Sequence, residues 1–122
     1  MNDWKTIYLL EDNIDLCTLV ADALLAAGYR VLSFPSIQAF HRKMVKPLPD
    51  LFILDMHLPY ADGSVVVERL MEMSPVVIPP VIVMSSTVDN GVASLTLGKR
   101  FFMPKPFHMD VLLATVKRLL KV

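Results

Sequence analysis

Short apolar runs and longer periodic segments alternate along the chain. The apolar runs lie at residues 6–10, 31–34, 51–54, 81–84 and 101–103, and polar or proline-containing sequence bounds them. Runs of this length with turn-forming borders are typical of strands buried on both faces of a parallel sheet. Segments with helical character follow at about residues 14–27, 36–45, 65–73, 88–97 and 111–121. The alternation predicts repeated βα units with right-handed crossovers, and hence an α/β fold with one parallel sheet.

The sequence defines some of these helices better than others. In the first, the apolar residues at helical spacing are Ile14, Cys17, Ala21, Leu24 and Leu25. Gly28 is expected to close this helix as a C-cap. The residues that the last helix should bury are Leu112, Val116 and Leu119. The segment over 88–97 contains Gly91 and β-branched residues, so it is predicted to be the least stable helix.

The composition sets limits on the function. A length of 122 residues suits one domain, covering residues 1–122, and 12 basic against 12 acidic side chains give no net charge. No global field therefore favours direct nucleic-acid binding or an anionic membrane. With no apolar run near the length of a membrane span and no signal peptide, the protein is expected to be cytoplasmic. The single cysteine, Cys17, lies among apolar helix residues and is predicted to be a small buried hydrophobe.

Polar side chains stand where the predicted strands end. They are Glu11 and Asp12 after the first strand, Asp55 after the third, Ser85 after the fourth and Lys105 after the fifth. Because the carboxyl ends of parallel strands share one edge of a sheet, these side chains are expected to converge where open α/β sheets bind ligands. Taken alone, Asp55 could equally cap the turn that follows it.

Three acids at one edge require a counter-charge. Two carboxylates about 5 Å apart repel by roughly 3 kcal/mol at an effective dielectric constant near 20. Oxygen ligands without a histidine or cysteine cluster point to a hard cation, and Mg²⁺ suits one or two carboxylates because it keeps waters and accepts phosphate oxygens. Lys105 and the Ser85 hydroxyl would then supply a point charge and a neutral donor for an anion beside the metal.

Several segments match one known family in residue type and order. They are Tyr-Leu-Leu-Glu-Asp-Asn at 8–13, Leu-Phe-Ile-Leu-Asp-Met-His-Leu-Pro at 51–59, Asp-Gly at 62–63, Val-Ile-Val-Met-Ser-Ser at 81–86 and Lys-Pro-Phe at 105–107. Together they cover nearly the whole chain, which resembles a receiver domain of two-component response regulators. The resemblance implies a flavodoxin-like, doubly wound five-stranded parallel sheet of strand order 2-1-3-4-5 with helices on both faces. It also implies a protein that accepts a phosphoryl group from a sensor histidine kinase or a phosphotransfer protein, and that is no enzyme beyond slow autodephosphorylation.

The resemblance assigns roles at the acidic strand ends. Asp55 would be the phosphoacceptor. Glu11 and Asp12 would hold Mg²⁺ together with Asp55 and the backbone carbonyl of His57. The His57 side chain itself is more simply explained as a solvated loop residue at the mouth of the site.

Further roles by resemblance fall on the last two strands. Ser85 would bind a phosphoryl oxygen and report its arrival, and Lys105 would pair with the phosphoryl charge. The family holds the peptide bond after this lysine in the cis form, which fits Lys105-Pro106. Phe102 stands where many members carry a switching tyrosine, so it can rotate but cannot donate a hydrogen bond.

The output of the switch is expected at the surface formed by the helix over 88–97, the strand over 101–103 and the last helix. Apolar residues gather there in sequence, namely Leu95, Leu97, Phe101 and Met103. An exposed patch of this kind usually marks a partner site, although Leu95 and one of the two phenylalanines are expected to belong to the core. Lys99 and Arg100 replace acidic residues that are usual in the family, so a homodimer through this surface would be held by apolar contact.

Two interpretations from other classes remain open. A phosphatase or phosphotransferase that uses an aspartate nucleophile usually has a second aspartate two residues later, and here that position is His57. A receiver-like module that binds partners without phosphorylation would have no need of the set found here, namely Asp12, Asp55, Ser85 and Lys105. Phosphorylation of Asp55 would exclude the second of these interpretations.

Overall fold

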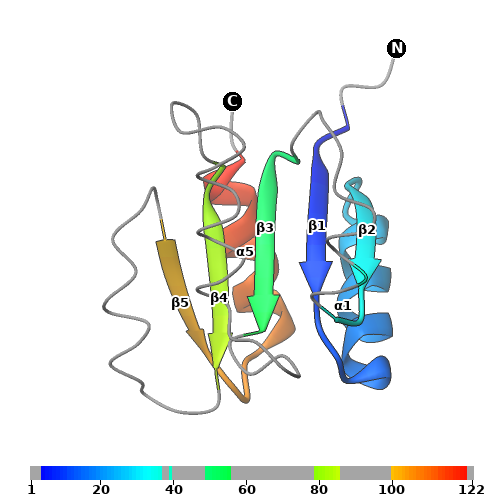
Figure 1. Cartoon of the computed structure of the whole chain (residues 1–122). Helices are drawn as coiled ribbons and strands as arrows, with labels where there is room; N and C mark the ends of the chain where they lie inside the picture. Colours follow the sequence, from blue (N-terminus) through cyan, green and yellow to red (C-terminus); the bar gives the residue numbers. More distant parts are fainter. Residues whose placement is uncertain (1–3, 37–38, 40–48, 56–78, 86–99, 121–122) are drawn as a thin grey trace.

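A computed structural model describes residues 4–36, 39, 49–55, 79–85 and 100–120. Five strands form one sheet: β1 (Thr6–Leu10), β2 (Arg30–Phe34), β3 (Leu51–Asp55), β4 (Val81–Ser85) and β5 (Arg100–Pro104). All neighbouring pairs are parallel, and the order is β2-β1-β3-β4-β5 (Figure 1). The predicted parallel sheet and its 2-1-3-4-5 order are therefore confirmed.

Burial along the strands follows their place in the sheet. Every residue of the central strand β3 is buried, as its unbroken apolar run predicts. The edge strand β2 buries only Phe34 and leaves Leu32 47 % exposed, because it has a neighbour on one side only. The centre of the sheet is thus buried on both faces, and its parallel strands end at one edge.

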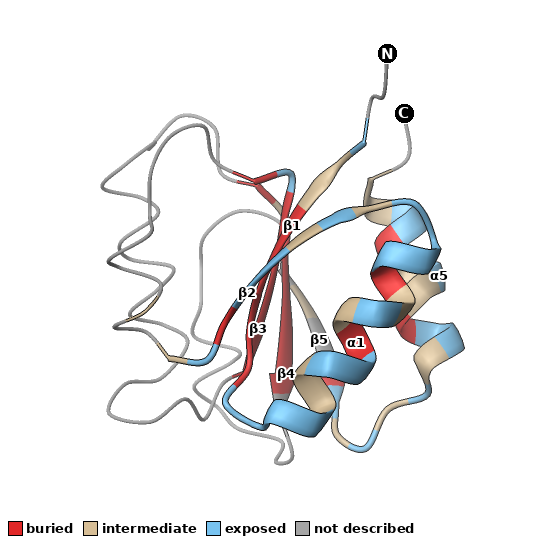
Figure 2. Ribbon diagram, turned by 90° about the vertical axis from the view of Figure 1, so that its right-hand side faces the viewer, coloured by how far each residue is buried: buried red, intermediate tan, exposed pale blue. Residues whose placement is uncertain are grey.

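Two helices, α1 (Ile14–Ala26) and α5 (Met109–Leu119), cover the same face of the sheet (Figure 2). Between them and the strands lies a core that includes Val20, Leu24, Leu112 and Val116. The remaining predicted helices, at 36–45, 65–73 and 88–97, lie outside the described residues except for Ser36 and Ala39. The Ser36 hydroxyl accepts a hydrogen bond from the Ala39 amide at 3.1 Å, the bond expected where a helix begins.

Helix α1 begins and ends where local chemistry dictates. The side chain of Asn13 accepts a hydrogen bond from the Leu16 amide at 3.0 Å and so satisfies a backbone donor of the first turn. Gly28 has φ +100°, a backbone conformation that glycine adopts without steric cost, so the chain turns away into β2 just after the Ala27 cap.

The predicted buried stripe of α1 is partly wrong. Ile14 is 76 % exposed and Leu25 47 % exposed, whereas Val20, which the prediction omitted, is fully buried beside Leu24. Cys17 is half-buried and packs against the core, close to the prediction of a small buried hydrophobe. The helix carries apolar residues on several sides, so its own periodicity admits more than one stripe, and contact with the sheet selects one.

Other predicted positions need smaller corrections. Met103 was expected on an exposed apolar surface, but it is 6 % exposed and belongs to the core, and Phe101 is half-buried against it. Leu112 and Val116 are buried as predicted, while Leu119 is only partly buried. The peptide bond between Lys105 and Pro106 is cis, as expected. Within the described residues, no helix has the length and apolar character needed to cross a membrane.

Candidate functional site

The carboxyl ends of the central strands bring the candidate residues together. Glu11 directly follows β1, Asp55 is the last residue of β3, and Lys105 directly follows β5. The register pairs Leu10 with Leu54, so Glu11 and Asp55 come next on adjacent parallel strands. This is the point where the strand order reverses, which is where open α/β sheets bind their ligands.

Three carboxylates form a cluster at this edge, which we call the acidic site. Glu11, Asp12 and Asp55 each offer an oxygen, and these oxygens lie within 4.8 Å of one another. Glu11 is 1 % exposed and Asp55 4 % exposed, whereas Asp12 is exposed to solvent. The predicted convergence of the three acids is therefore present, with two of them buried and the third open to an incoming ligand.

Lys105 lies between the two buried acids. Its Nζ is 3.0 Å from Glu11 Oε1 and 3.4 Å from Asp55 Oδ2. The ammonium group supplies part of the counter-charge that the clustered carboxylates require. Lys105 had been expected to pair with an anion; it also holds the two buried acids in place.

Burial and charge shift the acid–base properties of this group. Burial raises the pKa of Glu11 above its usual value, although the Asn13 amide and Lys105 both act in the opposite direction. For Lys105, burial on its own lowers the pKa, but the hydrogen bond to Glu11 and the charges of Asp55 and Glu11 outweigh it and raise the pKa. Lys105 consequently stays charged at neutral pH.

Asn13 is a residue of the site whose role the sequence prediction missed. Its backbone amide donates to Glu11 Oε2 at 3.1 Å, while its side chain caps α1. Glu11 is thus held from both sides, by the Asn13 amide and by Lys105. Asn immediately before a helical pattern is a recognised N-cap signal, so the sequence did carry a clue.

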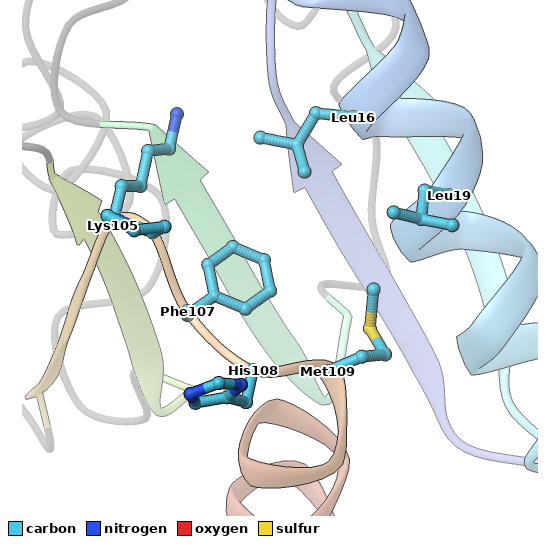
Figure 3. Close-up of a pocket in the computed structure, with 7 residues that line it drawn as sticks. Leu16, Leu19, Lys105, Phe107, His108 and Met109 are labelled. Atoms are coloured by element: carbon cyan, nitrogen blue, oxygen red, sulfur yellow. The ribbon is translucent and has the colours of Figure 1, made fainter.

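An apolar cavity lies next to the acidic site. It has a volume of about 550 Å³ and is lined by Leu16 and Leu19 of α1 and by the segment from Lys105 to Met109. In Figure 3, the ring of Phe107 lies between two elements: α1, which carries Leu16 and Leu19, and the start of α5. Lys105 belongs to both the cavity and the acidic site, so a molecule in the cavity would lie beside the acids.

Several predicted site residues fall outside the described part of the chain. Ser85 ends β4 beside Pro104, but its side chain is not among those described. The same holds for the side chain of Phe102 in β5 and for all of His57. Their predicted roles remain predictions.

The fold and the site define a class before any comparison. An all-parallel sheet of order 2-1-3-4-5 with buried acids and a lysine at its switch point is typical of a flavodoxin-like α/β fold, in which ligands bind at that edge. A family model, the response regulator receiver domain, matches residues 7–117. The chain belongs to this family and is a receiver domain of two-component response regulators.

Curated relatives agree with this assignment. The chain is 32 % identical over 119 residues to the phosphate regulon transcriptional regulatory protein PhoB of Pseudomonas aeruginosa, covering 96 % of this chain and 52 % of that protein. It is 33 % identical over 118 residues to the transcriptional regulatory protein CssR of Bacillus subtilis, with the same coverage. The chain thus spans about half the length of these relatives.

Solved structures show the same fold. The BeF3-activated DrrB receiver domain superimposes with a TM-score of 0.83 at 25 % identity, covering 98 % of this chain and 99 % of that one. The non-phosphorylated HemR receiver domain of Leptospira biflexa gives a TM-score of 0.86 at 24 % identity, covering 97 % and 95 %. Receiver domains of this family interact with histidine kinases and bind Mg²⁺ in an acidic pocket, and they are generally not enzymes.

Proposed function

We propose that Asp55 accepts a phosphoryl group from a sensor histidine kinase or a phosphotransfer protein, with Mg²⁺ as the cofactor. The observation that carries this proposal is the acidic site itself, in which oxygens of Glu11, Asp12 and Asp55 lie within 4.8 Å of one another and Lys105 pairs with Glu11 and Asp55. A carboxylate beside a cation site and a lysine has what phosphoryl transfer needs, namely a nucleophile and positive charge for the phosphoryl oxygens.

The donor set fits a magnesium ion. All three donors are carboxylate oxygens, the kind of ligand that Mg²⁺ prefers in proteins. Glu11, Asp12 and Asp55 would hold the ion, with the backbone carbonyl of His57 as a further ligand. When bound, the ion neutralises charge on the oxygens of the transferred group.

Residues of the chain itself have the other roles in phosphoryl transfer and in the response to it. An oxygen of Asp55 attacks the phosphorus, so that a bond to this oxygen forms while the bond to the donor's histidine nitrogen breaks. Lys105, which stays charged, turns from the acids toward the new phosphoryl oxygens. The Ser85 hydroxyl donates to one of these oxygens, and Phe102 rotates in response.

The kinase or phosphotransfer protein is proposed to dock at the apolar cavity. Leu19 is 60 % exposed and Ile14 76 % exposed, so α1 offers apolar contact directly beside the acids. A partner that fills the cavity against Phe107 would bring a phosphohistidine to the edge where Asp55 lies. The output is proposed to leave through the segment over 88–97, β5 and α5, where a homodimer could form.

Intact-mass analysis after treatment with acetyl phosphate and Mg²⁺ tests the proposal. One added phosphoryl group is expected on the unaltered chain and none on Asp55→Ala. The matched control is Asp22→Ala, which removes an exposed aspartate of α1 and should still gain one group. An adduct that persists in Asp55→Ala, or that forms equally well with a metal chelator present, would overturn the assignment. No adduct on any protein would favour a module that works without phosphorylation.

A further inference from the structure

A second cavity lies at the opposite end of the molecule from the acidic site. It has a volume of about 470 Å³ and lies between the start of β2 and the last turns of α5. The residues that line it are Tyr29, Ala114, Lys117, Arg118 and Leu120. We call it the basic cavity. Its volume falls within the range of about 300–1,000 Å³ that is usual for small-molecule sites.

The cations of the basic cavity have no acidic partner among the described residues. Lys117 and Arg118 are exposed, and the ion pairs found in the described part of the chain all involve Lys105. The register pairs Thr6 with Arg30, so Lys5 comes opposite Tyr29, the residue before the neighbouring strand β2. The acid beside Thr6 is Asp50, whose carboxylate already accepts a hydrogen bond from the Thr6 amide at 2.8 Å.

The helix to which these cations belong does not neutralise them. Lys117 and Arg118 lie in the last turn of α5, where the negative end of the helix dipole corresponds to roughly half an elementary charge. Two side-chain charges therefore exceed what the helix end balances. The excess favours a ligand with more than one negative charge.

The other residues that line the basic cavity offer mainly apolar surface. Tyr29 is half-buried and packs against the core, which fixes its ring, and Leu120 packs against the same core. Ala114 leaves space between the helix and the strand. A ligand here meets an aromatic ring and aliphatic side chains together with a planar guanidinium and an ammonium group.

We infer that the basic cavity binds a phosphate monoester with a small apolar body, about the size of one aromatic ring. Arg118 can bind two phosphate oxygens at once, Lys117 adds a point charge, and Tyr29 and Leu120 contact the apolar body. A ligand bridging the start of β2 and the end of α5 would not occupy the acidic site, because the two sites share no residue.

Titration with phenyl phosphate, followed by amide NMR shifts, tests this inference. The experiment uses Asp55→Ala without Mg²⁺, so that the acidic site does not compete for the probe. Saturable shifts centred on Tyr29, Ala114 and Leu120 are expected, and adding Arg118→Ala should weaken binding about tenfold or more. The matched control is Arg30→Ala, also an exposed arginine but not a lining residue, which should leave the affinity unchanged.

Two sets of results would contradict the proposed phosphate monoester site. If inorganic phosphate binds as tightly as phenyl phosphate, the apolar wall contributes nothing and the proposed ligand class is wrong. If the shifts centre elsewhere, do not saturate, or survive Arg118→Ala unchanged, the basic cavity is not a phosphate monoester site. Because Asp55 is absent throughout, none of these outcomes depends on the proposed phosphoacceptor.

Discussion

The charged side chains at the two ends of the sheet are opposite in sign and differ in burial and in pairing. At the carboxyl end, Glu11 and Asp55 are buried and share the ammonium group of Lys105. At the amino end, Lys117 and Arg118 are exposed and have no acidic partner among the described residues. The chain as a whole has 12 basic and 12 acidic side chains, so its zero net charge hides this separation.

The difference shows what burial does to a charge. Buried charges cannot be screened by water, so each depends on the others, and removing one leaves its partners uncompensated. Exposed charges are hydrated and nearly independent, so they are available to a ligand at little expense in stability. Substitutions at the carboxyl end should therefore change stability strongly, and those at the amino end mainly binding.

The largest effect is expected from Lys105→Met. This change leaves Glu11 and Asp55 facing each other without their shared cation, and breaking a buried ion pair from one side typically costs about 3–5 kcal/mol. Because Lys105 remains 21 % exposed, we expect the lower end, a loss of about 3 kcal/mol in the free energy of unfolding at pH 7. Urea unfolding of the variant and the unaltered chain measures it.

The pH dependence of the stability loss in Lys105→Met tests whether the loss is electrostatic. Burial raises the pKa of Glu11, and removing Lys105 takes away an influence that lowers it. A carboxyl group whose pKa is raised by folding contributes stability at low pH and loses it as the pH rises through the raised pKa. The deficit of Lys105→Met should therefore shrink as the pH falls from 7 toward 4.5, the ordinary pKa of this group. A deficit independent of pH would show that Lys105 acts through packing alone.

A smaller effect is expected from magnesium. An ion that binds only the folded chain stabilises it by mass action, by about 1.4 kcal/mol at ten times its dissociation constant. The melting temperature should rise with MgCl2 more than with NaCl at equal ionic strength, and Asp12→Ala should abolish the difference. Asp22→Ala, which removes an aspartate far from the acidic cluster in sequence, should respond like the unaltered chain. An equal rise in Asp12→Ala would contradict a metal site at Asp12.

The smallest effect is expected at the amino end. Lys117→Met removes an exposed lysine that no described carboxylate pairs with, so the free energy of unfolding should change by no more than about 0.5 kcal/mol. The same urea experiment and the same substitution as for Lys105 make the two ends directly comparable. A loss approaching that of Lys105→Met would mean that the charge at the amino end is as tightly coupled to the fold as the acidic site.

The strands were predictable because their signal is local. A short apolar run bounded by turn-forming residues, such as Leu51–Leu54, favours a buried strand over a helix, and all five predicted strands agree with the structure to within a residue or two at each end. Helix α1 was predicted in extent but not in orientation. Ile14 and Leu25 were assigned to the core although Val20 occupies it, because several apolar stripes were compatible with the same helix.

The sequence by itself determined which chemical groups end the strands and, through the alternation of strands and helices, that Glu11, Asp12, Asp55 and Lys105 share one edge. Only the tertiary structure decided how they combine. It buried Glu11 and Asp55, left Asp12 in water, and brought Lys105 to 3.0 Å from a residue 94 positions away. Burial and long-range distance depend on the order of the strands and on which face of each helix packs against the sheet. Neither quantity is a property of a local stretch of sequence.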